Sequence, residues 1–275
     1  MFSRCKRAVV AALTIWAAVA PVSSYASDEL KVGGTGSAMA TIDALAEAYR
    51  RHVPDFKLKL VPNLGSSGGL KALSAGAVDF ALVSRVLKPA EAASGLTAYT
   101  YGRSPFVLVT NKPDIRDLTS ARLADMLATR AAVWADGTPV RLVLRPTADA
   151  DSFLLGEFSP GIKLALAAAH ARGGMVLAVT DQESADQSER LPGSLGTSSL
   201  ALLKAEKRSL HVLSVDGVEP TLANLASGAY PHAKTMAIVV RGEASAEVRK
   251  FLGFIESDEA RTLLESLGHL TESAR

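Results

Sequence analysis

The chain alternates strand-like and helix-like runs, and short turns rich in glycine and hydroxyl residues join several of them. In the clearest unit, the alternating segment 57–61 leads through the turn 62–67 into a helix-like run that begins near Leu70. A second unit has the same layout, with a strand at 30–32 followed by the turn 33–37. Repeated strand–turn–helix units predict an α/β fold with mostly parallel sheets.

The helix beginnings in these two units suit an anion. The first amides of a helix lack partners within the helix, and the helix dipole makes this end positive. Ser66 and Ser67 lie there in one unit, and Gly36 and Ser37 lie there in the other, where we expect Ser37 to be the N-cap. Such a position either binds an anion or carries an ordinary helix cap, and both interpretations remain open.

Two further strands end at polar side chains. The strand 78–83 is followed by Ser84 and Arg85, and the strand 140–145 ends at Arg145 before a polar turn that contains Asp149, Asp151 and Ser152. Ligands bind at the carboxyl ends of strands in open α/β sheets, and an arginine fork matches an oxyanion. Surface ion pairs for the arginines, helix capping for the aspartates and an ordinary loop hydroxyl for Ser84 are the alternatives.

The chain breaks its pattern twice, at 111–114 and at Tyr230-Pro231. We therefore expect two lobes with a ligand cleft between them: residues 27–111 plus 233–275 form lobe 1, and residues 112–232 form lobe 2. Segment 191–196 is expected to be a loop, and a polar helix is expected to begin at 180–183.

The first 26 residues have the features of a secretory signal. Arg4, Lys6 and Arg7 precede the apolar run 8–20, and a small-residue cleavage site ends at Ala26. We expect a protein that is soluble in the periplasm and has lost Cys5, which is the only cysteine.

Composition and motifs exclude several functions. Removing the signal takes the formal net charge from +2 to −1, and aromatic residues make up 5% of the chain, so a nucleic-acid partner is not expected. No metal-binding motif, cofactor fingerprint or serine-hydrolase motif occurs. The five histidines are scattered, and we expect His52, His170 and His269 to be solvated or partly buried near helices. A serine hydrolase is the least favoured alternative, and it stays open only because the members of a triad need not be adjacent in sequence.

Several motifs occur in an order that resembles the phosphate-binding protein of phosphate ABC transporters, a family of type II periplasmic binding proteins. They are Gly65-Ser66-Ser67-Gly68-Gly69 followed by 78–80, the segment 118–127 with Trp134, Arg145 with Ser152-Phe153, and Tyr230-Pro231. The resemblance implies a two-lobed fold that closes on a small oxyanion, most simply phosphate. It also implies delivery to an ABC permease in the inner membrane, with no catalysis. No metal and no cofactor are expected. We expect a monomer.

By position, the resemblance makes Ser37 the match of a phosphate-binding threonine, Ser66 that of a ligand serine, and Arg145 that of the ligand arginine. Ser84 stands where the family has an aspartate that accepts the proton of hydrogen phosphate. The family's Gly-Ser-Gly-Thr loop is Ala148-Asp149-Ala150-Asp151 here.

A carboxylate about 4 Å from a dianion costs several kcal/mol, so these differences leave three alternatives. Asp149 or Asp151 replaces the missing proton acceptor, or the ligand is not phosphate, or both aspartates point away and cap the helix. A periplasmic sensor or adaptor of the same fold, with a different ligand or none, is the alternative function.

Overall fold

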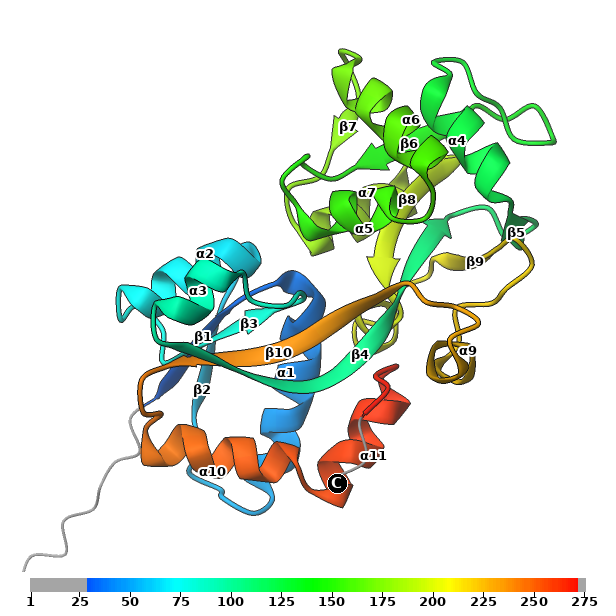
Figure 1. Cartoon of the computed structure of the whole chain (residues 1–275). Helices are drawn as coiled ribbons and strands as arrows, with labels where there is room; N and C mark the ends of the chain where they lie inside the picture. The colour runs from blue at the N-terminus through cyan, green and yellow to red at the C-terminus, as the bar shows by residue number, and fades with distance from the viewer. Residues whose placement is uncertain (1–28, 272–275) are drawn as a thin grey trace, which may run out of the picture.

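The computed structural model describes residues 29–271, which form two groups of helices and strands joined by two long strands (Figure 1). The signal predicted at residues 1–26, including Cys5, lies outside the described residues. The expected α/β fold is confirmed.

The first group contains both chain ends of the described part. Parallel pairing of β1 with β2 and β3 exposes an apolar face, against which Ile42 and Phe251 pack without solvent exposure. Its elements are β1 (Leu30–Gly34), α1 (Gly36–Arg50), β2 (Leu58–Val61), α2 (Gly65–Ser74), β3 (Phe80–Val83), α3 (Pro89–Ala93), β10 (Ala233–Arg241), α10 (Ala246–Ile255) and α11 (Asp258–Ser266).

The second group is built from the middle of the chain around its own core, which includes Leu123, Ile162 and Tyr230. Its elements are β5 (Asp117–Leu118), α4 (Ser120–Ala128), β6 (Arg141–Leu144), α5 (Ala150–Gly156), α6 (Pro160–Ala171), β7 (Val176–Leu177), α7 (Asp181–Arg190), β8 (Ser194–Ser199), α8 (Leu200–Ala205), β9 (His211–Val215) and α9 (Leu222–Ser227).

The two groups share β4 (Leu96–Thr110), which pairs antiparallel with β10 along its first part and with β8 and β9 along its second. The strands follow the order β2-β1-β3-β10-β4-β8-β6-β7. Pairing is therefore more mixed than expected: β1, β2 and β3 run parallel, as do β6, β7 and β8, while β4 and β10 oppose their neighbours.

The lobe boundaries stay a prediction, although the two cores bear on them. Tyr101 belongs to the first core, whereas Phe106 and Leu108 belong to the second. We propose on this basis that the first crossing lies inside β4, before residue 111.

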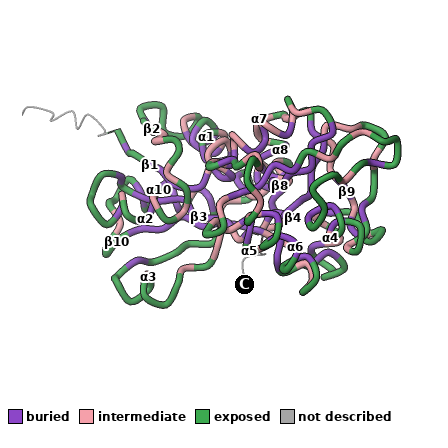
Figure 2. The backbone as a smooth tube through the Cα atoms, turned by 90° about the horizontal axis from the view of Figure 1, so that it is seen from above, coloured by how far each residue is buried: buried purple, intermediate pink, exposed green. Residues whose placement is uncertain are grey.

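The expectation of a loop at 191–196 is wrong in part, because β8 begins at Ser194. All six residues of β8 are buried, and the strand lies in the interior between β4 and β6 (Figure 2). Its sequence, Ser-Leu-Gly-Thr-Ser-Ser, has the composition of a turn. Small side chains suit this strand because α7 packs closely on it: a Cβ on Gly196 would lie 2.4 Å from Ser188 Oγ.

His269 also differs from expectation, because its side chain is fully buried. Nε2 lies 3.0 Å from Thr41 Oγ1, and the ring lies 5.5 Å from that of Tyr101. Burial lowers the pKa of His269 to about 3.

We predict that this histidine makes stability depend on pH. Below about 6.5 the unfolded chain protonates His269 while the folded protein does not, until the pH reaches about 3. The free energy of unfolding should therefore fall with decreasing pH in this window by up to about 1.4 kcal/mol per pH unit from this group. Urea unfolding of wild type and His269→Gln across this range measures the difference between their free energies of unfolding. The contributions of the other titrating groups are common to both proteins and cancel in this difference. Parallel pH profiles for the two proteins would contradict the prediction.

Candidate functional site

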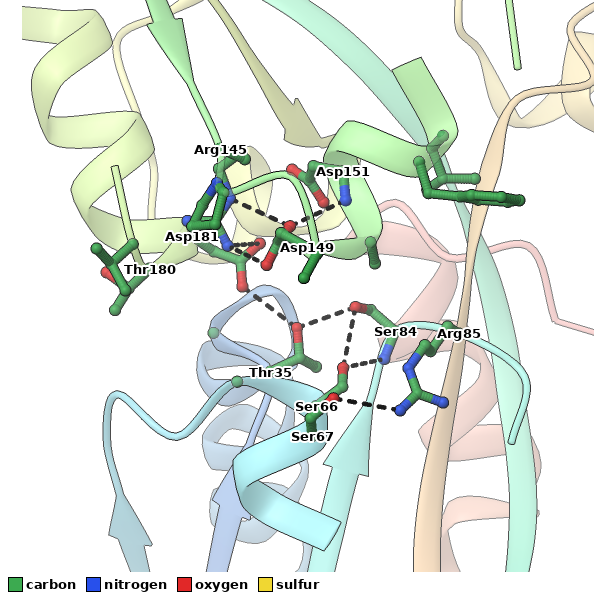
Figure 3. A pocket seen from close by; sticks show the side chains of 18 of the residues that line it. Thr35, Ser66, Ser67, Ser84, Arg85, Arg145, Asp149, Asp151, Thr180 and Asp181 are labelled. Atoms are coloured by element: carbon green, nitrogen blue, oxygen red, sulfur yellow. Dashed lines mark hydrogen bonds and ion pairs between the residues drawn. The ribbon is translucent and has the colours of Figure 1, made fainter. Parts of the chain in front are cut away.

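A cavity of about 830 Å³ lies between the two groups of elements (Figure 3). Its polar lining comes from both sides and collects most of the residues singled out in the sequence. From the first group come Thr35, Gly36, Ser66, Ser67, Ser84 and Arg85; from the second come Arg145, Asp149, Asp151, Thr180 and Asp181. The carboxyl ends of β1, β3 and β6 thus face one another, as expected for a ligand site in an α/β fold.

The helix beginnings on the first side differ from the expected caps. Thr35, not Ser37, is the N-cap of α1, so Ser37 lies in the first turn with its amide and hydroxyl free to bind other groups. Neither Ser66 nor Ser67 caps α2, whose N-cap is Leu64. Instead, Ser66 Oγ accepts a hydrogen bond of 3.2 Å from the Ser84 amide.

Gly36 allows the two sides to meet. A Cβ at this position would lie 2.1 Å from Gln182 Oε1, at the start of α7. The side-chain Nε2 of Gln182 donates to the Gly36 carbonyl, at 3.0 Å. The missing side chain therefore lets the N-terminal ends of α1 and α7 come together.

Arg145 extends from the end of β6 into the site and is 5% exposed. Its guanidinium donates to both carboxylate oxygens of Asp149, at 3.3 and 2.9 Å, and to the Ala178 carbonyl at 2.9 Å. Asp149 also caps α5, because it accepts from the Asp151 amide. Asp149 thus forms the ion pair with Arg145 and also caps α5.

Ser152 does not line the cavity, contrary to expectation. Its hydroxyl donates to the Arg145 carbonyl at 3.0 Å, which ties the first turn of α5 to the end of β6. Ser152 therefore helps to hold the backbone from which the Arg145 side chain extends.

Asp151 does not cap α5, whose N-cap is Asp149. It is buried and forms a 2.5 Å ion pair with Lys234, whose side chain is fully buried at the start of β10. Lys234 is a site residue that the sequence analysis missed. A signal was present: strand alternation puts Lys234 on the same face as Met236 and Ile238, which are core residues.

Asp181, at the first position of α7, is the most highly coordinated side chain of the site. One carboxylate oxygen accepts from Ser37 Oγ at 2.7 Å and from Lys234 Nζ at 3.0 Å. The other accepts from the Ser37 amide at 3.1 Å and lies 3.2 Å from Thr35 Oγ1. Arg145 Nη2 is 4.0 Å away. No direct sign of this role is visible in the sequence, because aspartate is common in the first turn of a helix.

The charges of this cluster shift one another's pKa values. Burial raises the pKa of Asp151 above its usual range; Lys234 offsets part of this rise, and Asp181 adds to it. Burial acts in the same direction on Asp181, but Lys234 and Arg145 outweigh it and hold the pKa of that carboxyl well below its usual range. Burial disfavours the charged form of Lys234, yet Asp151 and Asp181 raise the pKa of the ammonium. The pKa of Asp151 rises to about 6, so at neutral pH its carboxylate is ionised together with Asp181 and faces the Lys234 ammonium.

Arg85 lines the cavity but already has an anionic partner. Its two terminal nitrogens each lie 2.7 Å from an oxygen of Glu91, and Nη2 is 3.4 Å from Ser67 Oγ. The hydrogen bond from Arg85 lowers the pKa of Glu91 to about 2, although burial opposes it. Of the interpretations given for Arg85, the structure favours the ion pair.

The hydroxyls of the cavity have no histidine partner among residues 29–271. Ser66 and Ser84 bond to Thr35 or to each other. Ser37, which was expected in the lining, lies outside it and bonds to Asp181 and Lys234. Within the same residues no three metal-ligating side chains cluster, and no helix is long and apolar enough to cross a membrane. The serine-hydrolase alternative thus gains no support.

Comparison with known proteins supplies the family. The PBP superfamily domain matches residues 19–259. The chain belongs to this superfamily. The phosphate-binding protein PstS of Bacillus subtilis is 24% identical over 85% of this chain and 77% of its own length.

Two solved structures show the same fold as this PBP superfamily chain. A putative phosphate ABC transporter substrate-binding protein from Clostridium perfringens, with bound phosphate, has a TM-score of 0.77 at 20% identity, over 90% of this chain and 100% of that one. The periplasmic molybdate-binding protein of Azotobacter vinelandii has a TM-score of 0.64 at 15% identity, over 89% and 100%. The expected type II periplasmic binding protein fold is confirmed.

We predict that Lys234 is essential to the stability of the cluster. Lys234→Met leaves Asp151 and Asp181 buried without their shared ammonium, and breaking a buried pair in this way costs about 3–5 kcal/mol. Urea unfolding should show this loss, while Lys250→Met, on the exposed surface of α10, should unfold like wild type. A loss below about 1 kcal/mol, typical of solvated pairs, would contradict the burial of the cluster.

Proposed function

We propose that this chain is an extracytoplasmic solute-binding protein that captures a small oxyanion, with phosphate as the leading candidate, and delivers it to an ABC permease. One observation carries the proposal: in a PBP superfamily chain, the buried Arg145 of one side and the hydroxyls and helix amides of the other line a single cavity. The names of its relatives support phosphate as the anion.

Each side contributes a different kind of contact in this proposal. Ser66, Ser84 and the first amides of α2 supply hydrogen-bond donors on lobe 1, and Arg145 supplies the cation on lobe 2. Gly36, Ser67 and Arg85 complete the lobe 1 side, and Asp149 and Asp151 flank Arg145. Ser37 does not line the cavity, but it bonds to Asp181, which does. Closing the lobes would exclude water and strengthen every contact, because electrostatic interactions grow in a low dielectric.

Other features of the proposal have separate support. The superfamily's role in solute binding supports binding without catalysis or a cofactor. The signal-like residues 1–26 and the transporter relatives support a periplasmic location. We expect the protein to act as a monomer.

A sensor or adaptor with a different ligand, or none, is the second candidate. The observation that favours it is the pairing of the cavity's cations: Arg145 faces Asp149, and Arg85 faces Glu91. A chain that acts through a protein partner would capture that partner equally well with and without anion.

We predict that Arg145→Ala abolishes oxyanion binding while the protein stays folded. The side chain supplies the cation of lobe 2, and its removal leaves Asp149 as a helix cap that remains partly exposed to solvent. Calorimetric titration of protein stripped by unfolding and refolding, with phosphate, sulfate, arsenate and molybdate, measures the loss. Circular dichroism checks the fold, and Arg145→Lys serves as the matched control that keeps the charge without the fork.

Two results would separate the candidates. Micromolar phosphate binding by Arg145→Ala would remove Arg145 from the site. If the wild-type protein binds none of these oxyanions, the oxyanion proposal is refuted and the sensor or adaptor remains.

A further inference from the structure

Asp181 has the contacts that a bound oxyanion would need. Its two oxygens accept hydrogen bonds from the Ser37 amide and hydroxyl and from the Lys234 ammonium, and Thr35 Oγ1 lies within hydrogen-bonding distance. Helix-start amides, hydroxyls and cations are the groups with which proteins bind phosphate and sulfate. Here a carboxylate of the chain itself occupies them.

These contacts run between the two sides of the cavity. Asp181 belongs to α7 on the second side, whereas Thr35 and Ser37 belong to the beginning of α1 on the first. In Figure 3 the hydrogen bond between Thr35 and Asp181 joins the lower group of labelled side chains to the upper one. Gln182, next in the chain, adds the hydrogen bond to Gly36 described above.

The net charge of the cluster disfavours a further anion while Asp181 stays in place. Asp149, Asp151 and Asp181 carry three negative charges, against two positive charges on Arg145 and Lys234. A dianion would therefore enter a buried cluster that is already negative, at a cost that grows as the dielectric falls. Without Asp181 the remaining charges cancel.

We propose that Asp181 is an internal ligand, whose carboxylate occupies the oxyanion position and holds the two lobes closed in the absence of solute. The proposal rests on the proposed function in treating that position as the solute's, since an oxyanion must then displace Asp181 to bind. The apparent affinity for solute is reduced by the fraction of protein in which Asp181 is displaced.

The test removes the carboxylate. In Asp181→Ala, Lys234 keeps its ion pair with Asp151 and Arg145 keeps its pair with Asp149, so each buried cation retains a partner. Asp258→Ala is the matched control, because Asp258 also stands first in its helix after a hydroxyl N-cap but is 96% exposed. Asp181→Asn keeps the shape and an acceptor oxygen while it removes the charge.

The first readout is the distance between the lobes. Because Cys5 is the only cysteine, Cys5→Ser allows spin labels to be placed at Lys71→Cys on α2 and Lys163→Cys on α6, both exposed. Without anion, pulsed dipolar spectroscopy should give a longer or broader distance distribution in Asp181→Ala than in wild type or Asp258→Ala. Asp181→Asn should show the same change to a smaller extent. Identical distributions in all four proteins would overturn the proposal.

The second readout is affinity. Titration with sodium phosphate should show binding to Asp181→Ala that is roughly tenfold or more tighter than to wild type, and phosphate should restore the short distance. Equal or weaker binding in Asp181→Ala would overturn the displacement. Opening in Asp181→Ala with no oxyanion binding by either protein would support Asp181 as the closing group and refute the proposed function. Failure of both Asp181 variants to fold would make Asp181 a structural ion-pair partner and overturn the proposal.

Discussion

The buried pair of Lys234 and Asp181 sets the main physical constraint on this protein. Removing two charges from water costs several kcal/mol each, and their attraction repays this only when further hydrogen bonds satisfy both groups. Lys234 is fully buried and bonds to Ser37, Asp151 and Asp181, while Asp181 accepts from Ser37 at the beginning of α1 and from Lys234 of β10. The pair is therefore stable only if the elements that carry these partners keep their relative positions.

The topology of the sheet meets that requirement. Lys234 sits where β10 passes between the two cores, opposite Ser104 of β4. Parallel strands bring the beginnings of α1 and α7 to the same region, and their exposed amides and dipoles both favour a carboxylate between them. The arrangement of strands and helices that creates a solute cleft in this superfamily thus also creates a position where an internal anion is stabilised.

Hydrophobic periodicity was enough to predict the architecture but not the contacts of the site. Amphipathic helices such as α4 and α10 and the apolar strand β3 follow directly from the spacing of their buried residues. β8 was missed in part because its small polar side chains have turn composition, and only the close packing of α7 against Gly196 accounts for them. Arg145 and its turn could be located because they end a clear strand. The role of Asp181 could not, since its partners are distant in sequence and local chemistry already explains an aspartate there.

The position of Asp181 also explains why a neutral residue, Ser84, follows β3. The resemblance to phosphate-binding proteins places an aspartate at the end of β3, where this chain has a serine. Ser84 Oγ lies 3.1 Å from Thr35 Oγ1, which is itself 3.2 Å from Asp181 Oδ2. A carboxylate at residue 84 would stand close to that of Asp181, and two such charges in a buried site repel strongly.

A neutral residue at 84 and a carboxylate at 181 therefore form a consistent set: the negative charge that faces Thr35 comes from the second side of the cavity instead of the first. In this arrangement the carboxylate bridges the two lobes, which an aspartate on β3 would do only through the solute.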